Sequence, residues 1–361
     1  EFFYDLGYGV PYLKLGVSAA NLRGLPISAA ESYTGVDGWR NHPGNLKYAS
    51  DLAWTEGINR LVFHRYAHQP WPDLVPGMTM GPYGIHFDRT NTWWKPGKAW
   101  IASLTRCQFL LQRGTTAADV LCFAGEAVPN TSPNLNDLKR AGYDYDFCGT
   151  DILHQLTVKD GHVVVPSGRT YRALLMGPTG QPYLSLRAAE KLRELVAAGA
   201  TVIGQKPTHT PSLTGFPEAA TELLSIADEA WGRKEKALAS QKSDDQTAVG
   251  KAALTPDVIL PEGSDKLHWI HRQSETEDIW FISNQSRRAQ QATLGFRVTG
   301  KLPELWDGVD GSIQPAAGWH VQGDHTYVPL SFQADGSAIV VFRKPGEAPT
   351  DPVIAVTSEP K

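Results

Sequence analysis

The N-terminal third of the chain alternates between helical and strand-like apolar patterns, and this alternation limits the folds open to it most strongly. Apolar residues recur at helical spacing in three segments, and two short apolar runs of strand length lie between them. The helical segments cover residues 13–23, 43–57 and 97–113, and the strand-like runs cover residues 25–31 and 58–64. Strands that alternate with helices predict a parallel sheet and an α/β fold.

A second alternating series begins near residue 119. Its strand-like runs lie at 119–125, 143–148, 172–178 and 201–204, and Ser185 caps a helix between the last two. This pattern predicts a doubly wound α/β domain, flavodoxin-like or amidotransferase-like. Because the segment has no Gly-rich phosphate loop and no nucleophile elbow, we expect a structural role for it.

The C-terminal third changes to short strands with turn residues between them. These runs cover residues 267–272, 278–284, 293–298 and 338–342. Short strands separated by turns are typical of an antiparallel β-sandwich.

These patterns predict a multidomain α/β chain. Residues 1–115 resemble the C-terminal part of a (β/α)8 barrel, residues 116–232 form the doubly wound domain, and residues 257–345 form the sandwich. Residues 233–256 are polar and predict a linker, and residues 346–361 predict a tail. Since a (β/α)8 barrel needs eight strand–helix units, we expect the missing units to lie in an N-terminal part of the same polypeptide, which would be a partner of this one.

Composition narrows the classes of function. The net charge is −4 and no basic block occurs, so neither nucleic acid nor an anionic membrane is indicated as a partner. No apolar run is long enough to cross a bilayer. Cys107, Cys122 and Cys148 lack the spacing of a zinc site and are odd in number, so we expect buried free thiols.

Glu31 is the first candidate for chemistry. It ends an apolar run of small residues and is followed by polar and turn-forming residues, which places it where a strand meets a loop. Glu1 stands one helix-plus-strand unit upstream. Carboxylates at neighbouring strand ends are what glycoside hydrolysis requires, at about 6.5–9.5 Å in inverting enzymes. The alternatives are a Glu31 paired with Arg and a Glu1 that frays at the chain terminus.

Polar and aromatic residues follow the next strand on the same predicted edge. We expect contacts with sugar hydroxyls or stacking on sugar rings from six of them: His64, His68, Gln69, Trp71, Asn91 and Trp94. The alternatives are a structural histidine, aromatic rings that seal the core, and local hydrogen bonds that fix the loop. His64 and His68 are assigned no metal, because the segment is extended and calcium prefers oxygen ligands. Glu126 follows a strand of the second domain and is expected to be a solvated loop carboxylate.

Several motifs in order resemble glycoside hydrolase family 106, the α-L-rhamnosidases. They are Ala30-Glu31-Ser32-Tyr33-Thr34, Gly57-Ile58-Asn59-Arg60, residues 63–71 (FHRYAHQPW), residues 76–82 (PGMTMGP), Asn91-Thr92-Trp93-Trp94, residues 106–114 (RCQFLLQRG) and Glu304-Leu305-Trp306-Asp307. The resemblance extends over nearly the whole chain.

The resemblance implies an inverting exo-glycosidase that removes terminal α-L-rhamnose from oligosaccharides, polysaccharides or glycosides. It implies a (β/α)8 barrel assisted by calcium, whose ligands it does not identify here. Glu31 resembles the general base, and Glu1 resembles a glutamate that helps to hold the attacking water. The general acid of the family lies further upstream. We expect a periplasmic or secreted bacterial enzyme.

Two other functions fit the same residues. A retaining barrel glycosidase of the β-galactosidase type also has a small α/β domain after its barrel. A non-catalytic carbohydrate-binding fragment would fit a chain that holds only part of a barrel.

Overall fold

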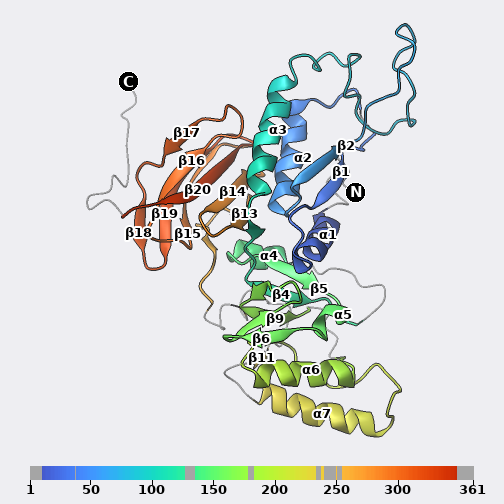
Figure 1. Cartoon of the computed structure of the whole chain (residues 1–361), viewed down its shortest axis with the longest axis vertical. Coiled ribbons are helices and arrows are strands. Elements are labelled where there is room, and N and C mark those ends of the chain that lie inside the picture. Colours follow the sequence, from blue (N-terminus) through green and yellow to red (C-terminus); the bar gives the residue numbers. More distant parts are fainter. Residues whose placement is uncertain are drawn as a thin grey trace. The chain divides into compact units, whose positions relative to one another are not determined.

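The computed structural model describes residues 10–36, 38–126, 135–177, 183–232, 237–239, 249 and 254–347. The chain divides into two compact units (Figure 1). The first unit consists of residues 1–17, 26–117 and 260–361, and the second consists of residues 18–25 and 118–259. Predicted site residue Glu1 lies outside the described residues.

Two parallel strands form the first sheet of the first unit. Strand β1 (Ala29–Ser32) pairs with β2 (Arg60–Phe63), and Glu31 stands opposite Val62 in this register. Helices α2 (Pro43–Thr55) and α3 (Lys98–Leu111) lie beside this pair (Figure 1). Strand β1 begins later than the predicted residue 25, because Ser28 still lies before the ladder, where its amide donates a hydrogen bond of 2.9 Å to Asn59 Oδ1.

The start of α2 follows from its local sequence. His42 is extended, and its ring accepts a hydrogen bond from the Gly44 amide, while the Asn45 side chain accepts one from the His42 amide. Pro43 occupies the first turn, where its missing N–H group leaves no intrahelical bond unmade. This reciprocal cap satisfies amide groups that a helix N-terminus otherwise leaves unpaired.

Antiparallel sheets make up the rest of the first unit. One has the strand order β17-β16-β20-β14-β13-β3. Its members are β3 (Thr115–Thr116), β13 (Leu267–Gln273), β14 (Asp278–Asn284), β16 (Lys301–Trp306), β17 (Ile313–Pro315) and β20 (Ser337–Pro345). In another, β19 (His325–Phe332) pairs with β15 (Gln290–Phe296) on one side and β18 (His320–Gln322) on the other.

One apolar core joins both parts of the first unit. It includes Tyr33 and Leu46 near the parallel strands and Phe281 and Val341 in the six-stranded sheet. Trp54 of α2 contacts Phe281 edge to face, with ring centroids 5.5 Å apart. The sequence patterns assigned residues 1–115 and 257–345 to separate domains. A sequence pattern shows which face of a helix or strand is apolar, but it does not show which other element packs against that face.

The second unit contains a parallel sheet with the strand order β11-β10-β9-β4-β5. Its strands are β4 (Val120–Phe123), β5 (Tyr145–Cys148), β9 (Ala173–Met176), β10 (Val202–Gly204) and β11 (Ala237–Ala239). Counted along the chain, this order is 2-1-3-4-5, as in flavodoxin-like sheets. Strand β11 lies inside the predicted linker 233–256. Its three-residue apolar run was too short to stand out from its polar surroundings, so this part of the linker prediction was wrong.

Helices and a small antiparallel sheet complete the second unit. The helices are α4 (Asn136–Arg140), α5 (Thr150–Leu153), α6 (Leu186–Ala197) and α7 (Glu218–Trp231), and residues 18–22 of α1 (Val10–Leu22) also belong to this unit. The small sheet contains β6 (Thr157–Lys159), β7 (His162–Val164) and β8 (Thr170–Tyr171), and β12 (Val258–Ile259) ends the unit. As predicted, Ser185 caps α6 through its side chain.

Two further predictions can be compared with the structure. Cys107, Cys122 and Cys148 are free and buried, as expected. Among the described residues, no helix has the length and apolar character needed to cross a membrane.

Candidate active site

Glu31 and His64 lie at the same end of the parallel strands. In β1, Ala30 and Ser32 point into the core, so Glu31 projects to the opposite, exposed face. His64 follows the last residue of β2, and its amide donates a hydrogen bond of 2.9 Å to the Ser32 carbonyl. The C-terminal ends of parallel strands share one edge of a sheet, so both residues lie at the edge where the sequence placed them.

The Glu31 carboxylate is exposed, and Thr34 holds it in the part of the chain that the structure describes. Thr34 Oγ1 donates a hydrogen bond of 2.8 Å to Glu31 Oε1. Val62, the register partner of Glu31, is 51% exposed, so this face of the strand pair is open. An exposed carboxylate with one fixed oxygen can accept a proton from water at its other oxygen.

Tyr33 anchors the chain just after this carboxylate. Its backbone is left-handed, with φ 71°, and its side chain is completely buried. The phenol oxygen lies 2.7 Å from Ser50 Oγ, and the ring contacts Phe63 and Trp100 at centroid distances of 5.3 and 5.9 Å. Burial raises the pKa of the Tyr33 phenol above its usual range, so it stays protonated. Tyr33 therefore anchors the backbone beside Glu31 in the apolar core.

The loop after β2 folds back beside His64. The His64 carbonyl accepts from the Ile85 amide at 3.0 Å, and the Arg65 amide donates to the Ile85 carbonyl at 3.0 Å. Gly84 has φ 87°, and a Cβ atom there would stand 2.4 Å from His64 Nδ1. Only glycine fits this position without strain. His64 is thereby held against the loop by backbone contacts.

His86 and Asp88 form a second pair of polar residues, near the end of the same loop. His86 is stacked against Trp39, with ring centroids 4.0 Å apart and planes 11° apart. His86 Nδ1 lies 4.0 Å from Asp88 Oδ2, and Asp88 is 1% exposed. Burial, and secondarily the nearby Arg65 cation, lower the pKa of His86. The imidazole is therefore held in its neutral form at neutral pH.

Several polar atoms of this loop are buried without a hydrogen-bond partner in the part of the chain that the structure describes. They are His64 Nδ1, Arg65 Nε, His86 Nδ1, Asp88 Oδ2 and Asn91 Nδ2. Unsatisfied buried polar groups are rare in folded proteins and call for a structural or functional reason. Their concentration between residues 64 and 91 marks this edge of the sheet as the candidate active site.

The remaining predicted sugar-binding residues occupy different environments. His68 and Trp71 are exposed, and Trp71 is 63% exposed. The Gln69 amide is used within the loop, where it donates to the Pro76 carbonyl at 2.7 Å. Asn91 is buried, and Trp94 packs edge to face on Trp93 against the core. Binding by these five residues stays a prediction.

The loop around Trp71 also has an unusual number of exposed apolar side chains. Large apolar residues that are each at least 46% exposed occur at seven positions: Tyr66, Trp71, Leu74, Val75, Met78, Met80 and Tyr83. Near the end of this loop, residues 84–88 form a continuous buried stretch.

The sequence interpretation missed Trp39 as a site residue. For the segment that ends at Asn91, it left open whether the polar side chains bind sugar hydroxyls or form local hydrogen bonds that fix the loop. Asp88 Oδ1 does accept from the Thr90 amide at 2.8 Å, so the local bond is present. The stack of Trp39 on His86 joins two loops that are far apart in sequence, so no local sequence pattern predicts it.

Calcium is implied by the family resemblance, which does not identify its ligands in this chain. No group of three or more His, Cys, Asp or Glu residues is arranged in the described ranges to hold a metal ion. Calcium also takes backbone and amide carbonyl oxygens as ligands, so its binding stays a prediction and no step of the chemistry is assigned to a metal.

Glu126 in the second unit is not a solvated loop carboxylate, and that prediction was wrong. Its two carboxylate oxygens accept from the Ser185 amide and the Ser185 hydroxyl, each at 2.7 Å. The sequence shows no sign of this pairing because the two residues belong to loops after different strands. Glu126 thus fixes the start of α6, where a negative charge is favourable.

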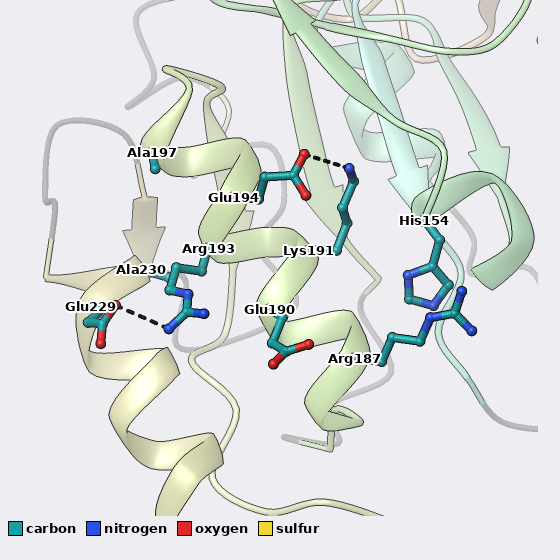
Figure 2. Close-up of a pocket in the computed structure, with 9 residues that line it drawn as sticks. All are labelled: His154, Arg187, Glu190, Lys191, Arg193, Glu194, Ala197, Glu229 and Ala230. Atoms are coloured by element: carbon teal, nitrogen blue, oxygen red, sulfur yellow. Dashed lines mark hydrogen bonds and ion pairs between the residues drawn. The ribbon is translucent and has the colours of Figure 1, made fainter.

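The second unit has a surface pocket of about 700 Å3 beside α6 and α7 (Figure 2). Its walls carry both signs of charge, and ion pairs join Lys191 to Glu194 at 2.8 Å and Arg193 to Glu229 at 3.4 Å. Such pairing leaves little net attraction for a charged ligand. We assign no catalytic role to this pocket.

Comparison with known proteins identifies the family of the chain. The chain matches the family model described as alpha-L-rhamnosidase, glycoside hydrolase family 106, over residues 13–320. A curated protein of Formosa agariphila, named "Putative beta-glucuronidase", is 38% identical over 345 residues, which are 94% of this chain and 29% of that protein.

Two solved structures of glycosidases are also similar to this chain. The rhamnosidase from Novosphingobium sp. PP1Y has a TM-score of 0.82 at 31% sequence identity, covering 95% of this chain and 33% of that one. The β-galactosidase from Bacillus circulans sp. alkalophilus, with a TM-score of 0.52 and 10% identity, covers 88% of this chain and 55% of that one, and shares the fold alone. The chain spans about a third of the length of the curated relative and of the rhamnosidase. By its match over most of its length, the chain belongs to glycoside hydrolase family 106, the α-L-rhamnosidases.

Proposed function

We propose that the polypeptide containing this chain removes terminal α-L-rhamnose from oligosaccharides, polysaccharides or glycosides, with inversion at the anomeric carbon. The observation that carries the proposal is the accessible carboxylate of Glu31 at the end of β1, beside the buried polar cluster of the loop after β2. Membership of the rhamnosidase family supports the choice of sugar.

Glu31 is proposed as the general base. Thr34 engages one carboxylate oxygen, and a water molecule bound at the other oxygen would be aimed at the anomeric carbon. As the water attacks, its proton passes to Glu31, and the glycosidic bond breaks toward a leaving group protonated by a separate acid. The acid stands about 6.5–9.5 Å from the base in inverting enzymes. We propose, as the family resemblance implies, that this acid lies upstream of the chain and that Glu1 helps to hold the water.

The fold is proposed to be the C-terminal part of a (β/α)8 barrel followed by a doubly wound unit and a β-sandwich. Glu31 and the half-exposed Val62 lie on the same face of the β1–β2 pair, opposite the face that packs on the core. This open face supports the barrel assignment. In a barrel this face points into the interior, and its C-terminal rim holds the active site. The paired Glu126 and Ser185 support a structural role for the doubly wound unit.

A second candidate substrate is a β-glucuronide. It is suggested by the name of the relative from Formosa agariphila. A glucuronide carries a carboxylate that a rhamnoside lacks, and Arg65 Nε is buried without a hydrogen-bond partner in the described part of the chain. A guanidinium is a suitable partner for a carboxylate.

The experiment compares both substrates on the full-length enzyme. Hydrolysis of an aryl α-L-rhamnoside and of an aryl β-D-glucuronide is measured side by side, and NMR identifies the anomer first released. Faster rhamnoside hydrolysis that releases β-L-rhamnose first supports the proposal. Faster glucuronide hydrolysis supports the second substrate, retention of configuration supports a β-galactosidase-like mechanism, and binding without turnover supports a non-catalytic role.

A further inference from the structure

Trp39 presents one free aromatic face at the candidate active site. It belongs to the loop that leaves β1 just after Glu31. Its other face is covered by His86, because the two rings are stacked at a centroid distance of 4.0 Å. His86 is 5% exposed, whereas Trp39 remains 55% exposed. Most of the solvent contact of the indole is therefore on the side away from His86.

The loop that carries Trp39 is fastened on both sides of the ring. The Gly35 carbonyl accepts from the Gly84 amide at 2.9 Å, and the Asn41 carbonyl accepts from Trp93 Nε1 at 2.8 Å. A Cβ atom at Gly38 would stand 2.2 Å from the Gly84 carbonyl oxygen, so the two backbones touch. A ring held in this way loses little conformational freedom when a ligand stacks on it.

The support beneath Trp39 is also fixed. Asp88 stands beside the His86 ring at 4.0 Å, and the other carboxylate oxygen of Asp88 accepts from the Thr90 amide at 2.8 Å. Asp88 is almost completely buried, so this arrangement is not disturbed by solvent. The exposed indole thus lies on a buried imidazole whose Nδ1 faces a buried carboxylate.

The position of this stack relates it to Glu31. The loop of Trp39 starts at the end of β1, and the loop of His86 starts at the end of β2, so both loops arise from the edge that holds the Glu31 carboxylate. A rigid aromatic face suits the C–H face of a pyranose, and the methyl group of a 6-deoxy sugar enlarges that apolar face. The general base must lie near the anomeric carbon of the same ring.

We propose that Trp39 stacks on the terminal sugar ring whose bond Glu31 helps to hydrolyse, and that His86 and Asp88 are positioning residues that hold the indole. This inference rests on the proposed function and adds a binding residue to it. A stacking contact acts on the bound sugar before and during the reaction, so its loss raises KM more than it lowers kcat.

The test uses the full-length enzyme with an aryl α-L-rhamnoside as substrate and L-rhamnose as inhibitor. For Trp39→Ala we expect KM and the inhibition constant of L-rhamnose to rise together by about tenfold, with kcat within about threefold of wild type. Trp39→Phe keeps a smaller flat face, so both constants should rise by less than about threefold. His86→Ala should raise KM, and His86→Phe should restore it because it keeps a ring beneath Trp39.

Phe216→Ala is the matched control, since Phe216 is 73% exposed and belongs to the second unit. It should leave both constants unchanged, and thermal melts check that every variant is folded. If the wild type hydrolyses the rhamnoside but Trp39→Ala leaves the L-rhamnose inhibition constant unchanged, the stacking proposal is wrong. A rise in KM alone would place the aglycone, not the sugar, on Trp39 and would also overturn it. A wild type that neither hydrolyses the rhamnoside nor binds L-rhamnose contradicts the proposed function itself.

Discussion

Replacing Glu31 by glutamine tests the proposed general base most directly. The amide has nearly the shape of the carboxylate, and its carbonyl oxygen can still accept the hydrogen bond from Thr34 Oγ1. Glu31 is exposed and has no other hydrogen bond given by the described residues, so the free energy of unfolding should change by no more than about 0.5 kcal/mol. The substitution removes the ability to accept a proton.

The expected loss of activity follows from that chemistry. A positioned general base contributes about 10²–10⁴-fold, which is about 2.7–5.4 kcal/mol of transition-state stabilisation. Because ground-state contacts are retained, kcat should fall by this factor while the affinity for L-rhamnose stays within about threefold of wild type. Thr34→Val removes only the hydrogen bond that orients the carboxylate, and we expect a smaller loss.

The assay compares kcat for an aryl rhamnoside between the full-length wild type and the Glu31→Gln variant, with thermal melts to exclude unfolding. Glu126→Gln is a poor control, because the Glu126 carboxylate binds Ser185 through both oxygens. Glu190→Gln is the better match, since Glu190 is an exposed carboxylate on α6. If Glu31→Gln keeps kcat within about threefold of wild type, Glu31 is not the base.

Three further predictions concern stability and reactivity. Burial opposes ionisation of Glu304, but hydrogen bonds from Arg343 and Lys344 outweigh it and lower its pKa to about 2 from 4.5. The stability that this carboxylate contributes is therefore complete above about pH 4.5 and lost as the pH falls toward 2, so urea unfolding should show a smaller difference between wild type and Glu304→Gln at pH 3 than at pH 7. Burial raises the pKa of Cys107 to about 12, so its thiol should react with Ellman's reagent at pH 8 only after unfolding; rapid native reaction would contradict the buried position. Ser185→Ala removes the cap of α6 and should lower the free energy of unfolding by about 1–2 kcal/mol, measured by urea titration, whereas an unchanged midpoint would show that the cap is not needed.

Local chemistry explains which parts of the fold were predictable. Helix α2 begins at Pro43 and α6 follows Ser185, because capping depends on residues within one turn of the helix start. The position of Glu31 at a strand end was also readable, since small apolar residues give way there to polar ones. Each of these features is encoded by neighbours in sequence.

Features that depend on distant residues were not predictable in this way. Trp39 lies on His86, and Glu126 binds Ser185, but in each case the partners come from different loops. Strand β11 is stabilised by its ladder with β10, not by its own short sequence. Pairings of this kind are set by topology, which a single sequence pattern does not contain.

The conformation of Tyr33 depends both on its neighbours in sequence and on distant residues of the core. A left-handed backbone costs a residue with a side chain about 1–2 kcal/mol, and burial of the Tyr33 ring among Phe63, Phe87 and Trp100 offsets that cost. The turn at Tyr33 ends β1 and directs its ring into the core, while Glu31, two residues earlier, keeps the exposed face of the strand. The strand that carries the proposed base is therefore anchored in the apolar core, and among the described residues Thr34 donates a hydrogen bond to the carboxylate. This arrangement lets the core fix the position of the carboxylate, while its other oxygen, Oε2, is the one proposed to bind the attacking water.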